Sequence, residues 1–451
     1  MTKKILIVSV VTVLMLVLFA ACAGPGGGAP AAGAGGGAVA ADAPAGQPGE
    51  AGGTVRMLMT PSDQWTETYA LLRTEFAELF PDIDLEVDLM GSTEIHVRYL
   101  TEFASGRSDY DIINSRHIYK NQLVLSGHVV NITDFLDNSD VISRDSFLPS
   151  FANPMVVVDG RWYGLPWRSD VKLFFYNKDL FERAGITSPP TTYLEVIEVA
   201  ERIQAETGQF GIVIPASGRW ILQAFTDYIS TIGDVTYFDS NWEPIFNNPE
   251  RVEGVNTLRR LLELSPPGAL AYDHAGAVTA FIQGQAGMLF MWPFVYSEAQ
   301  NPGQSAIVGQ VGIADAMPFV NHETAVLSGW NTMMTSFSEN RDAAWMVMEF
   351  MSSPSTERQV ILNGGNNNPV LAVSAYDEEL VTAVPVVRSI LQAQAAERAF
   401  MDYDIADWAE IGLIIQDFLA RAVSGEMDSQ AAMDEAARQA REILVDAGLV
   451  N

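Results

Sequence analysis

Tryptophan residues are the part of this sequence whose type and spacing best suit ligand chemistry. Several of the nine lie within two residues of a glycine or proline, as turn residues do, among them Trp162, Trp167, Trp220, Trp292 and Trp330. Indole faces stack on apolar ring faces, and a few placed polar groups then fix the ligand. Such polar residues stand beside tryptophans: Asp63 near Trp65, Arg168 and Asp170 after Trp167, Arg219 before Trp220, and Asn331 after Trp330. A single tryptophan more often packs in the core, but the set predicts that at least two line a binding site.

Residues for catalysis or metal binding form no comparable pattern. The five histidines include no pair at metal-ligand spacing, and the chain has one cysteine. Glycine-rich phosphate loops and the Gly-x-Ser-x-Gly motif are absent from the sequence. The 56 aspartates and glutamates are too many for residue type alone to select an acid/base pair. We therefore expect no catalytic residue, no metal and no cofactor, and keep an exported polysaccharide-cleaving enzyme as an alternative.

The chain is strongly acidic, with a formal net charge of −30 from 26 basic and 56 acidic side chains. Nucleic acids and anionic lipids are bound by basic surfaces, so this charge disfavours both as partners. Acidity by itself identifies no cationic ligand, because it also serves simply to keep an exterior solvated.

The N-terminal region has the composition of an export signal followed by a tether. Lys3 and Lys4 precede an apolar run over 5–19, which is shorter than the about 20 residues of a membrane span. Two alanines then lead to Cys22, an arrangement that resembles the lipobox of bacterial lipoproteins, where the thiol carries the lipid. A cleaved signal with an incidental cysteine is the alternative. Residues 23–53 are almost entirely Gly, Ala and Pro, which predicts a disordered tether.

The first segment after the tether predicts a β-α-β unit. Apolar residues alternate over 55–59 and 83–89, as in strands, and recur at helical spacing over 69–80 until Pro81. Such a unit is typical of an α/β fold with a parallel sheet covered by helices. Helical spacing predicts further helices at 192–206, 340–351, 405–423 and 429–447.

A second helix over 95–103 and a strand over 110–113 continue this pattern. Ligands of open α/β sheets bind beyond the carboxyl ends of strands, which points to residues 62–65 and 114–116. The candidates in these two segments are Asp63, Trp65, Asn114 and Arg116.

Several ordered blocks from Thr54 to the C-terminus resemble the extracellular sugar-binding proteins of ABC transporters. The blocks are DGRWYGLP at 159–166, FYNKDLFERAGI at 175–186, PTTYLE at 190–195, FIQGQAGM at 281–288, SGWN at 328–331 and AAW at 343–345. The chain departs from the family at Tyr193, where relatives have Trp. It departs again at Asn366, in a stretch where relatives often have an Arg.

The resemblance implies a two-lobed periplasmic-binding-protein-like fold, in which a hinge joins two α/β lobes and the ligand occupies the cleft between them. Its implied division of the chain is a signal peptide at 1–21, the lipidated cysteine and tether at 22–53, one lobe from 54–168 with 315–370, and the other from 169–314 with 371–451.

The resemblance also implies a site and a function. Trp292 becomes the best candidate for stacking on a sugar. The full set of expected ligand-binding residues is Asp63, Trp65, Asn114, Arg116, Trp167, Asp170, Arg219, Trp220, Trp292, Trp330, Asn331 and Asn366. The implied function is capture of a mono- or oligosaccharide outside the cell and its delivery, by hinge closure, to the permease of an ABC importer.

A polyamine or other cationic solute is the alternative ligand, against which Arg116, Arg168 and Arg219 argue. We expect a monomer that touches the outer face of the membrane only through the lipid on Cys22.

Overall fold

The computed structural model describes residues 52–60, 63–91, 94–233, 237–363, 368–388, 398–401 and 408–450. Cys22, the signal, almost all of the tether and Asn366 lie outside the described residues. Asp63 and Trp65 are described only as positions in a helix. All structural statements below concern the described residues.

The predicted β-α-β unit is confirmed. Strand β1 (Gly53–Met59) and strand β2 (Ile83–Leu89) pair in parallel along their whole lengths, and helix α1 (Asp63–Leu79) connects them. The helix starts six residues before the apolar spacing that predicted it, because its first turns are polar. Strand β3 (Ile112–Arg116) pairs in parallel with β1. The prediction that the segment 114–116 lies beyond the end of this strand is wrong, because β3 continues to Arg116.

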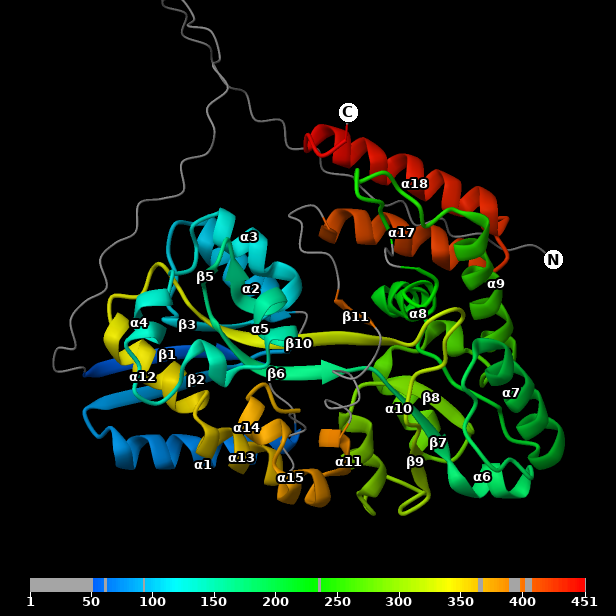
Figure 1. Ribbon diagram of the computed structural model, residues 1–451, viewed down its shortest axis with the longest axis horizontal. Helices are drawn as coiled ribbons and strands as arrows, with labels where there is room; N and C mark the ends of the chain where they lie inside the picture. The colour runs from blue at the N-terminus through cyan, green and yellow to red at the C-terminus, as the bar shows by residue number, and fades with distance from the viewer. Residues whose placement is uncertain are drawn as a thin grey trace, which may run out of the picture. The chain divides into compact units, whose positions relative to one another are not determined.

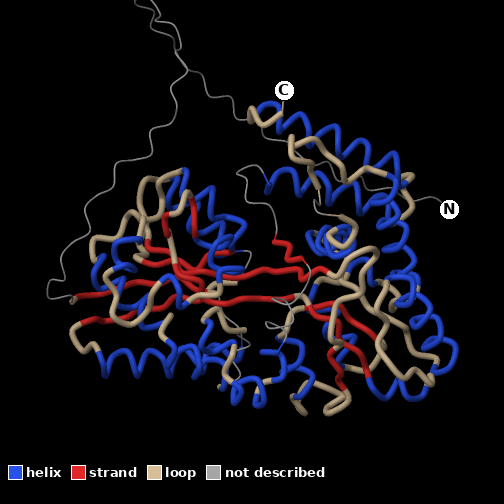
Figure 2. The backbone as a smooth tube through the Cα atoms, viewed as in Figure 1, coloured by secondary structure: helices blue, strands red, loops and turns tan. Residues whose placement is uncertain are grey.

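The larger sheet is mixed rather than purely parallel. Its order is β2-β1-β3-β10-β11, and β6 also pairs with β10 (Figures 1 and 2). Strand β10 (Thr324–Met334) is antiparallel to β3 and to β6 (Leu165–Val171), and parallel to β11 (Arg398–Met401). Every residue of β10 is buried, as expected for a strand covered on both faces.

The smaller sheet has three antiparallel strands in the order β8 (Met288–Met291), β7 (Leu173–Asn177) and β9 (Val311–Ile313). Only Lys172 separates β6 from β7, so one stretch of chain passes directly from the larger sheet into the smaller one (Figure 1). The boundaries assigned to the two lobes stay a prediction. Strand β11 falls in the stretch assigned to the second lobe, although it pairs with β10 of the larger sheet.

The four further helices predicted from apolar spacing lie close to their predicted positions. Helix α7 (Tyr193–Thr207) begins with a capping box between Thr192 and Glu195, in which each side chain accepts a hydrogen bond from the other residue's backbone. Part of the PTTYLE block is therefore a helix start. Helices α12 (Arg341–Met351), α17 (Trp408–Val423) and α18 (Ser429–Asp446) match the other three predicted helices.

Two main clusters of buried apolar side chains form the core. One includes the larger sheet, and the other gathers around α7, α17 and α18 with α8 (Arg219–Ile229) and α9 (Pro249–Glu263).

The remaining helices are α2 (Glu94–Ala104), α3 (Lys120–Leu125), α4 (Thr133–Asp137), α5 (Pro149–Val156), α6 (Lys178–Arg183), α10 (His274–Ile282), α11 (Phe294–Gln300), α13 (Pro354–Leu362), α14 (Ala372–Ala375) and α15 (Glu378–Ala383). Two short strands, β4 (Val157–Val158) and β5 (Arg161–Trp162), form a hairpin. None of the described helices combines the length and apolar character that crossing a bilayer requires.

Candidate functional site

Two predicted ligand residues, Arg116 and Trp330, lie in one row across the larger sheet with Arg168, which follows the predicted Trp167. Trp330 of β10 is directly opposite Arg116 of β3 on one side and Arg168 of β6 on the other. Opposed residues of antiparallel strands point to the same face, so Arg116, Trp330 and Arg168 share one face of the sheet, with Trp330 in the middle. The Cζ atom of Arg168 is 5.6 Å from the centroid of the Trp330 ring, within the range of a cation–π contact.

Asp170 extends this row along β6. It lies two residues after Arg168 and opposite Ser328, so it shares the face of Arg168. Its Oδ2 is 3.3 Å from Nη2 of Arg168. Burial raises the pKa of the Asp170 carboxyl, and the charges of Arg168 and Arg116 oppose that rise. Both arginines therefore stabilise the charged form of this carboxyl. We call Arg116, Trp330, Arg168 and Asp170 the Trp330 row.

A buried ion pair stands where the chain leaves the larger sheet. The Nζ of Lys172 is 3.2 Å from Oδ2 of Asp227 in α8, and the two side chains are 2% and 3% exposed. The same Nζ lies 5.0 Å from the ring centroid of Trp292, which directly follows β8 and is 7% exposed. The predicted stacking residue thus has an ammonium group over one of its faces. Sequence reasoning missed Lys172 and Asp227, although a lysine inside the apolar run 171–175 was a visible signal.

Arg219 and Trp220 form a second group at the start of α8. Arg219 lies over the ring of Trp220, with Cζ 4.6 Å from its centroid. The ring of His274 is 4.9 Å from that of Trp220 and 6.1 Å from that of Phe294. Burial lowers the pKa of His274, and Arg219 lowers it further while Asp273 opposes the change. This group is a neutral aromatic cluster with one arginine at its edge.

Two of the predicted ligand residues make their hydrogen bonds to the chain itself. Nδ2 of Asn114 donates to the carbonyl of Asn331 at 2.9 Å, and its Oδ1 accepts from the hydroxyl of Thr60 at 3.1 Å. Nδ2 of Asn331 donates to the carbonyl of Met155 at 3.1 Å. Both asparagines are fully buried, and these bonds tie β3, β10 and α5 together. Trp167 is the extra residue where the pairing of β6 with β10 shifts register, because Arg168 lies opposite Trp330 and Pro166 lies opposite Asn331.

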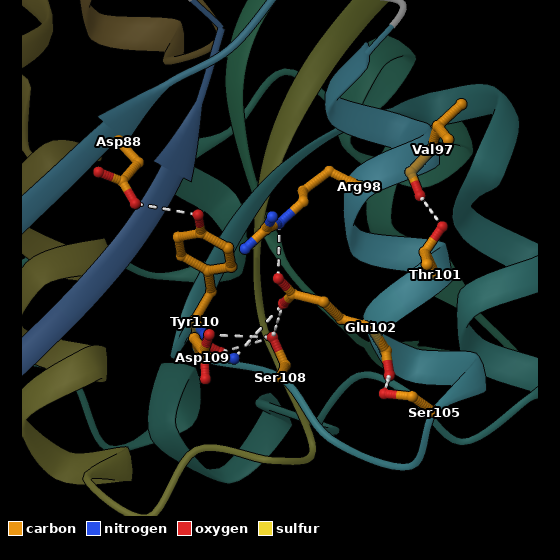
Figure 3. Close-up of polar contacts among 9 residues, drawn as sticks. All are labelled: Asp88, Val97, Arg98, Thr101, Glu102, Ser105, Ser108, Asp109 and Tyr110. Carbon is orange, nitrogen blue, oxygen red and sulfur yellow. Dashed lines mark hydrogen bonds and ion pairs between the residues drawn. The ribbon is translucent and has the colours of Figure 1, made fainter.

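A hollow of 530 Å³ beside α2 is a second place where polar side chains gather. Nε of Arg98 is 2.6 Å from Glu102, and the hydroxyl of Ser108 donates to Glu102 at 3.0 Å. The hydroxyl of Tyr110 donates to Asp88 at 2.9 Å (Figure 3). These contacts fix the segment 108–110 to α2 on one side and to β2 on the other, which favours a structural role. Among the described residues, no group of three His, Cys, Asp or Glu side chains is placed to hold a metal ion.

The structure is that of a two-lobed binding protein. Its two sheets are joined through β6, Lys172 and β7, and aromatic and charged side chains lie at the junction. Comparison with known proteins specifies the class. The chain belongs to the family of bacterial extracellular solute-binding proteins, whose model matches residues 62–358. That family consists of binding proteins of transport systems rather than enzymes.

Relatives and solved structures agree with this assignment. A probable amino-acid ABC transporter periplasmic-binding protein, y4oP of Sinorhizobium fredii, is 27% identical over 408 residues, which are 88% of this chain and 90% of the relative. A mannitol-binding protein of Pseudomonas aeruginosa is 25% identical over 328 residues, 70% of this chain and 74% of that protein. The structure of maltose-bound MalE3 from T. maritima superposes with a TM-score of 0.79 at 26% identity, covering 87% of this chain and 100% of MalE3. The predicted two-lobed α/β fold is confirmed.

Proposed function

We propose that this protein captures a sugar or sugar alcohol outside the cell and delivers it to the permease of an ABC importer. The observation that carries the proposal is that aromatic rings and charged, hydrogen-bonding side chains lie together at the junction of the two sheets. Trp330 lies between Arg116 and Arg168, and Trp292 lies against Lys172. Aromatic walls with a few placed polar groups suit a ring with apolar C–H faces and hydroxyl edges.

The similar proteins with named ligands support the same class, because one is named for mannitol and another holds maltose. A polyamine fits the site less well. Arg116, Arg168 and Lys172 would repel a cationic ligand, and each aspartate of the group already pairs with one of these cations.

Hinge closure without chemical change of the ligand is the proposed mechanism. The backbone connection between the sheets is held at several points: the N–H of Lys172 donates to the carbonyl of Val326 at 2.9 Å, and the hydroxyl of Thr324 donates to the carbonyl of Ser230 at 3.1 Å. A ligand that contacts both lobes shifts the equilibrium toward the closed state by its extra affinity for that state. We propose that the protein acts as a monomer.

The binding class is tested by a thermal-shift screen of the full chain, purified in detergent, against sugars, sugar alcohols, amino acids and polyamines. A ligand at a hundredfold excess over Kd stabilises the native state by about 2.7 kcal/mol. We expect sugars or sugar alcohols to raise the melting temperature. A shift with polyamines or amino acids alone would refute the proposal.

Replacing Trp292 with alanine is expected to weaken binding of the sugar found in that screen by at least about tenfold without unfolding the protein. An aromatic contact contributes about 0.5–1.5 kcal/mol beyond its buried area, and 1.4 kcal/mol corresponds to a factor of ten. Isothermal titration calorimetry measures the affinity and circular dichroism the fold. Trp292→Leu, which keeps apolar volume and removes the ring, serves if the alanine variant is unstable.

Trp345 in α12 is the matched control for Trp292. It is similarly buried and stacks on Phe135 with centroids 5.5 Å apart. Trp345→Ala should lower stability and leave affinity unchanged. Equal affinities for the wild type and Trp292→Leu would favour a packing role for Trp292.

We also propose that lipid on Cys22 and the tether 23–53 hold the binding protein at the outer face of the membrane. Mass spectrometry of the mature protein should find an acylated Cys22 as its first residue, and Cys22→Ala should release the protein from the membrane fraction. A mature N-terminus downstream of Cys22 would contradict the anchor.

A further inference from the structure

Positive charge gathers at the candidate site in a chain that is acidic overall. Arg116, Arg168 and Lys172 come from adjoining stretches at the junction of the sheets, with two carboxylates, Asp170 and Asp227, beside them. Asp170 pairs with Arg168, and Asp227 pairs with Lys172. Three cations against two carboxylates leave one positive charge in excess. With 26 basic against 56 acidic residues in the chain, composition alone would produce the opposite sign.

The excess charge belongs to Arg116. None of the ion pairs of the described part of the chain involves its guanidinium group. Its ionisable neighbours include two histidines that stay neutral. Burial, reinforced by the charge of Arg116, lowers the pKa of His117 to about 3 and that of His96 to about 4. Arg116 is thus a half-buried cation at the end of β3 that forms no ion pair within the described chain. The carboxylate whose pKa its charge lowers, Asp170, is already paired with Arg168.

Arg168 offers an unused donor on the other side of Trp330. Its Nη2 is near Asp170, but its Nε is buried and donates to no acceptor of the described chain. A buried donor without a partner destabilises the protein, so an acceptor supplied by a ligand would remove that cost. Strands lie about 4.8 Å apart, which separates the Cα atoms of Arg116 and Arg168 by about 10 Å across β10. Side chains as long as arginine can converge from that separation on one small anionic group.

We infer that the ligand is a sugar or sugar alcohol that carries a negatively charged group, and that Arg116 and Arg168 bind this group on either side of Trp330. Guanidinium groups match carboxylate and phosphate oxygens with paired, charge-assisted hydrogen bonds. Uronic acids, aldonic acids and sugar phosphates are the corresponding compounds. The inference rests on the proposed function and specifies its ligand.

Pairs of compounds that differ only in the acidic group test the inference. Calorimetric titration of the full chain in detergent compares D-glucuronate with D-glucose, D-galacturonate with D-galactose, D-gluconate with D-glucitol, and D-glucose 6-phosphate with D-glucose. We expect the acidic member of at least one pair to bind at least tenfold more tightly than the neutral member. Inorganic phosphate and acetate serve as probes for binding of an anion without a sugar.

Variants of Arg116 assign the effect to the site. Arg116→Gln should reduce affinity for the acidic compound at least tenfold more than affinity for its neutral counterpart, and Arg116→Lys should recover part of the loss because it restores the charge. Arg73→Gln, at an exposed arginine of α1, should change neither affinity.

The outcomes separate this inference from the proposed function. If neutral sugars or sugar alcohols bind as tightly as the acidic compounds or more tightly, the acidic ligand is refuted and the proposed function stands. Equal losses for both members of a pair in Arg116→Gln, or binding of phosphate or acetate as tight as that of the acidic sugar, would also refute it. If no compound of either kind binds, the proposed function fails together with the inference.

Discussion

Replacing Asp227 with alanine should lower the free energy of unfolding by about 3–5 kcal/mol, the cost of leaving a buried charge without its partner. Asp227 Oδ2 is 3.2 Å from the ammonium group of Lys172, and both side chains are almost fully buried. Removing the carboxylate leaves that ammonium group inside the protein at the point where β6 passes into β7. Denaturation in urea measures the change.

Two further variants control this experiment. Arg438 and Glu442 form an exposed i,i+4 ion pair at 2.6 Å on α18, and Glu442→Ala should cost far less stability than Asp227→Ala because water screens the exposed charges. The double variant Lys172→Met, Asp227→Leu should regain most of the stability that Asp227→Ala loses, because it leaves no charge buried. A loss below about 1 kcal/mol for Asp227→Ala would contradict the prediction, because it would show that the buried ammonium group of Lys172 does not need this carboxylate for stability.

Relative to a Glu357→Gln variant, the wild-type protein should lose about 3 kcal/mol of stability as the pH rises from about 4.5 to about 7. Burial raises the pKa of Glu357 from 4.5 to about 7, opposed by hydrogen bonds from the Ser374 side chain and the N–H groups of Val370 and Leu371. In this interval the native state keeps a proton that the unfolded chain has lost. The free energy of unfolding therefore falls with rising pH. Glutamine stays neutral throughout and lacks this dependence.

Urea denaturation of both proteins at several pH values measures the effect as the difference between their unfolding free energies. Taking the difference removes the contribution of all other titrating groups. Glu206→Gln, at an exposed position of α7, is the matched control for exchanging a carboxyl for an amide. A difference between wild type and Glu357→Gln that stays constant from pH 4.5 to 7 would contradict the prediction.

The sequence predicted those parts of the fold that depend on local periodicity. The β-α-β unit from β1 to β2 and the helices α7, α12, α17 and α18 follow from apolar spacing, and the capping box at Thr192 and Glu195 fixes where α7 begins. The composition around the tryptophans and the ordered motif blocks also pointed to a binding protein, which family membership confirms.

The site was predicted only in part, because burial and strand pairing depend on residues far apart in the chain. The side-chain amides of Asn114 and Asn331, both predicted ligand residues, also donate hydrogen bonds that tie strands to their neighbours, and no local pattern indicated these bonds. Lys172 and Asp227 were missed because no local pattern links them.

Residue type and order alone determined the α/β class, the start of α7, the acidic charge and the presence of aromatic residues suited to a sugar. The tertiary structure decided which of these side chains meet. Antiparallel pairing of β10 with β3 and β6 places Trp330 between Arg116 and Arg168. Packing of α8 against the chain between β6 and β7 joins Asp227 to Lys172 and sets that charge against Trp292. Hydrogen bonds between distant strands and the exclusion of water determine these side-chain contacts. Neither can be predicted from spacing along the chain.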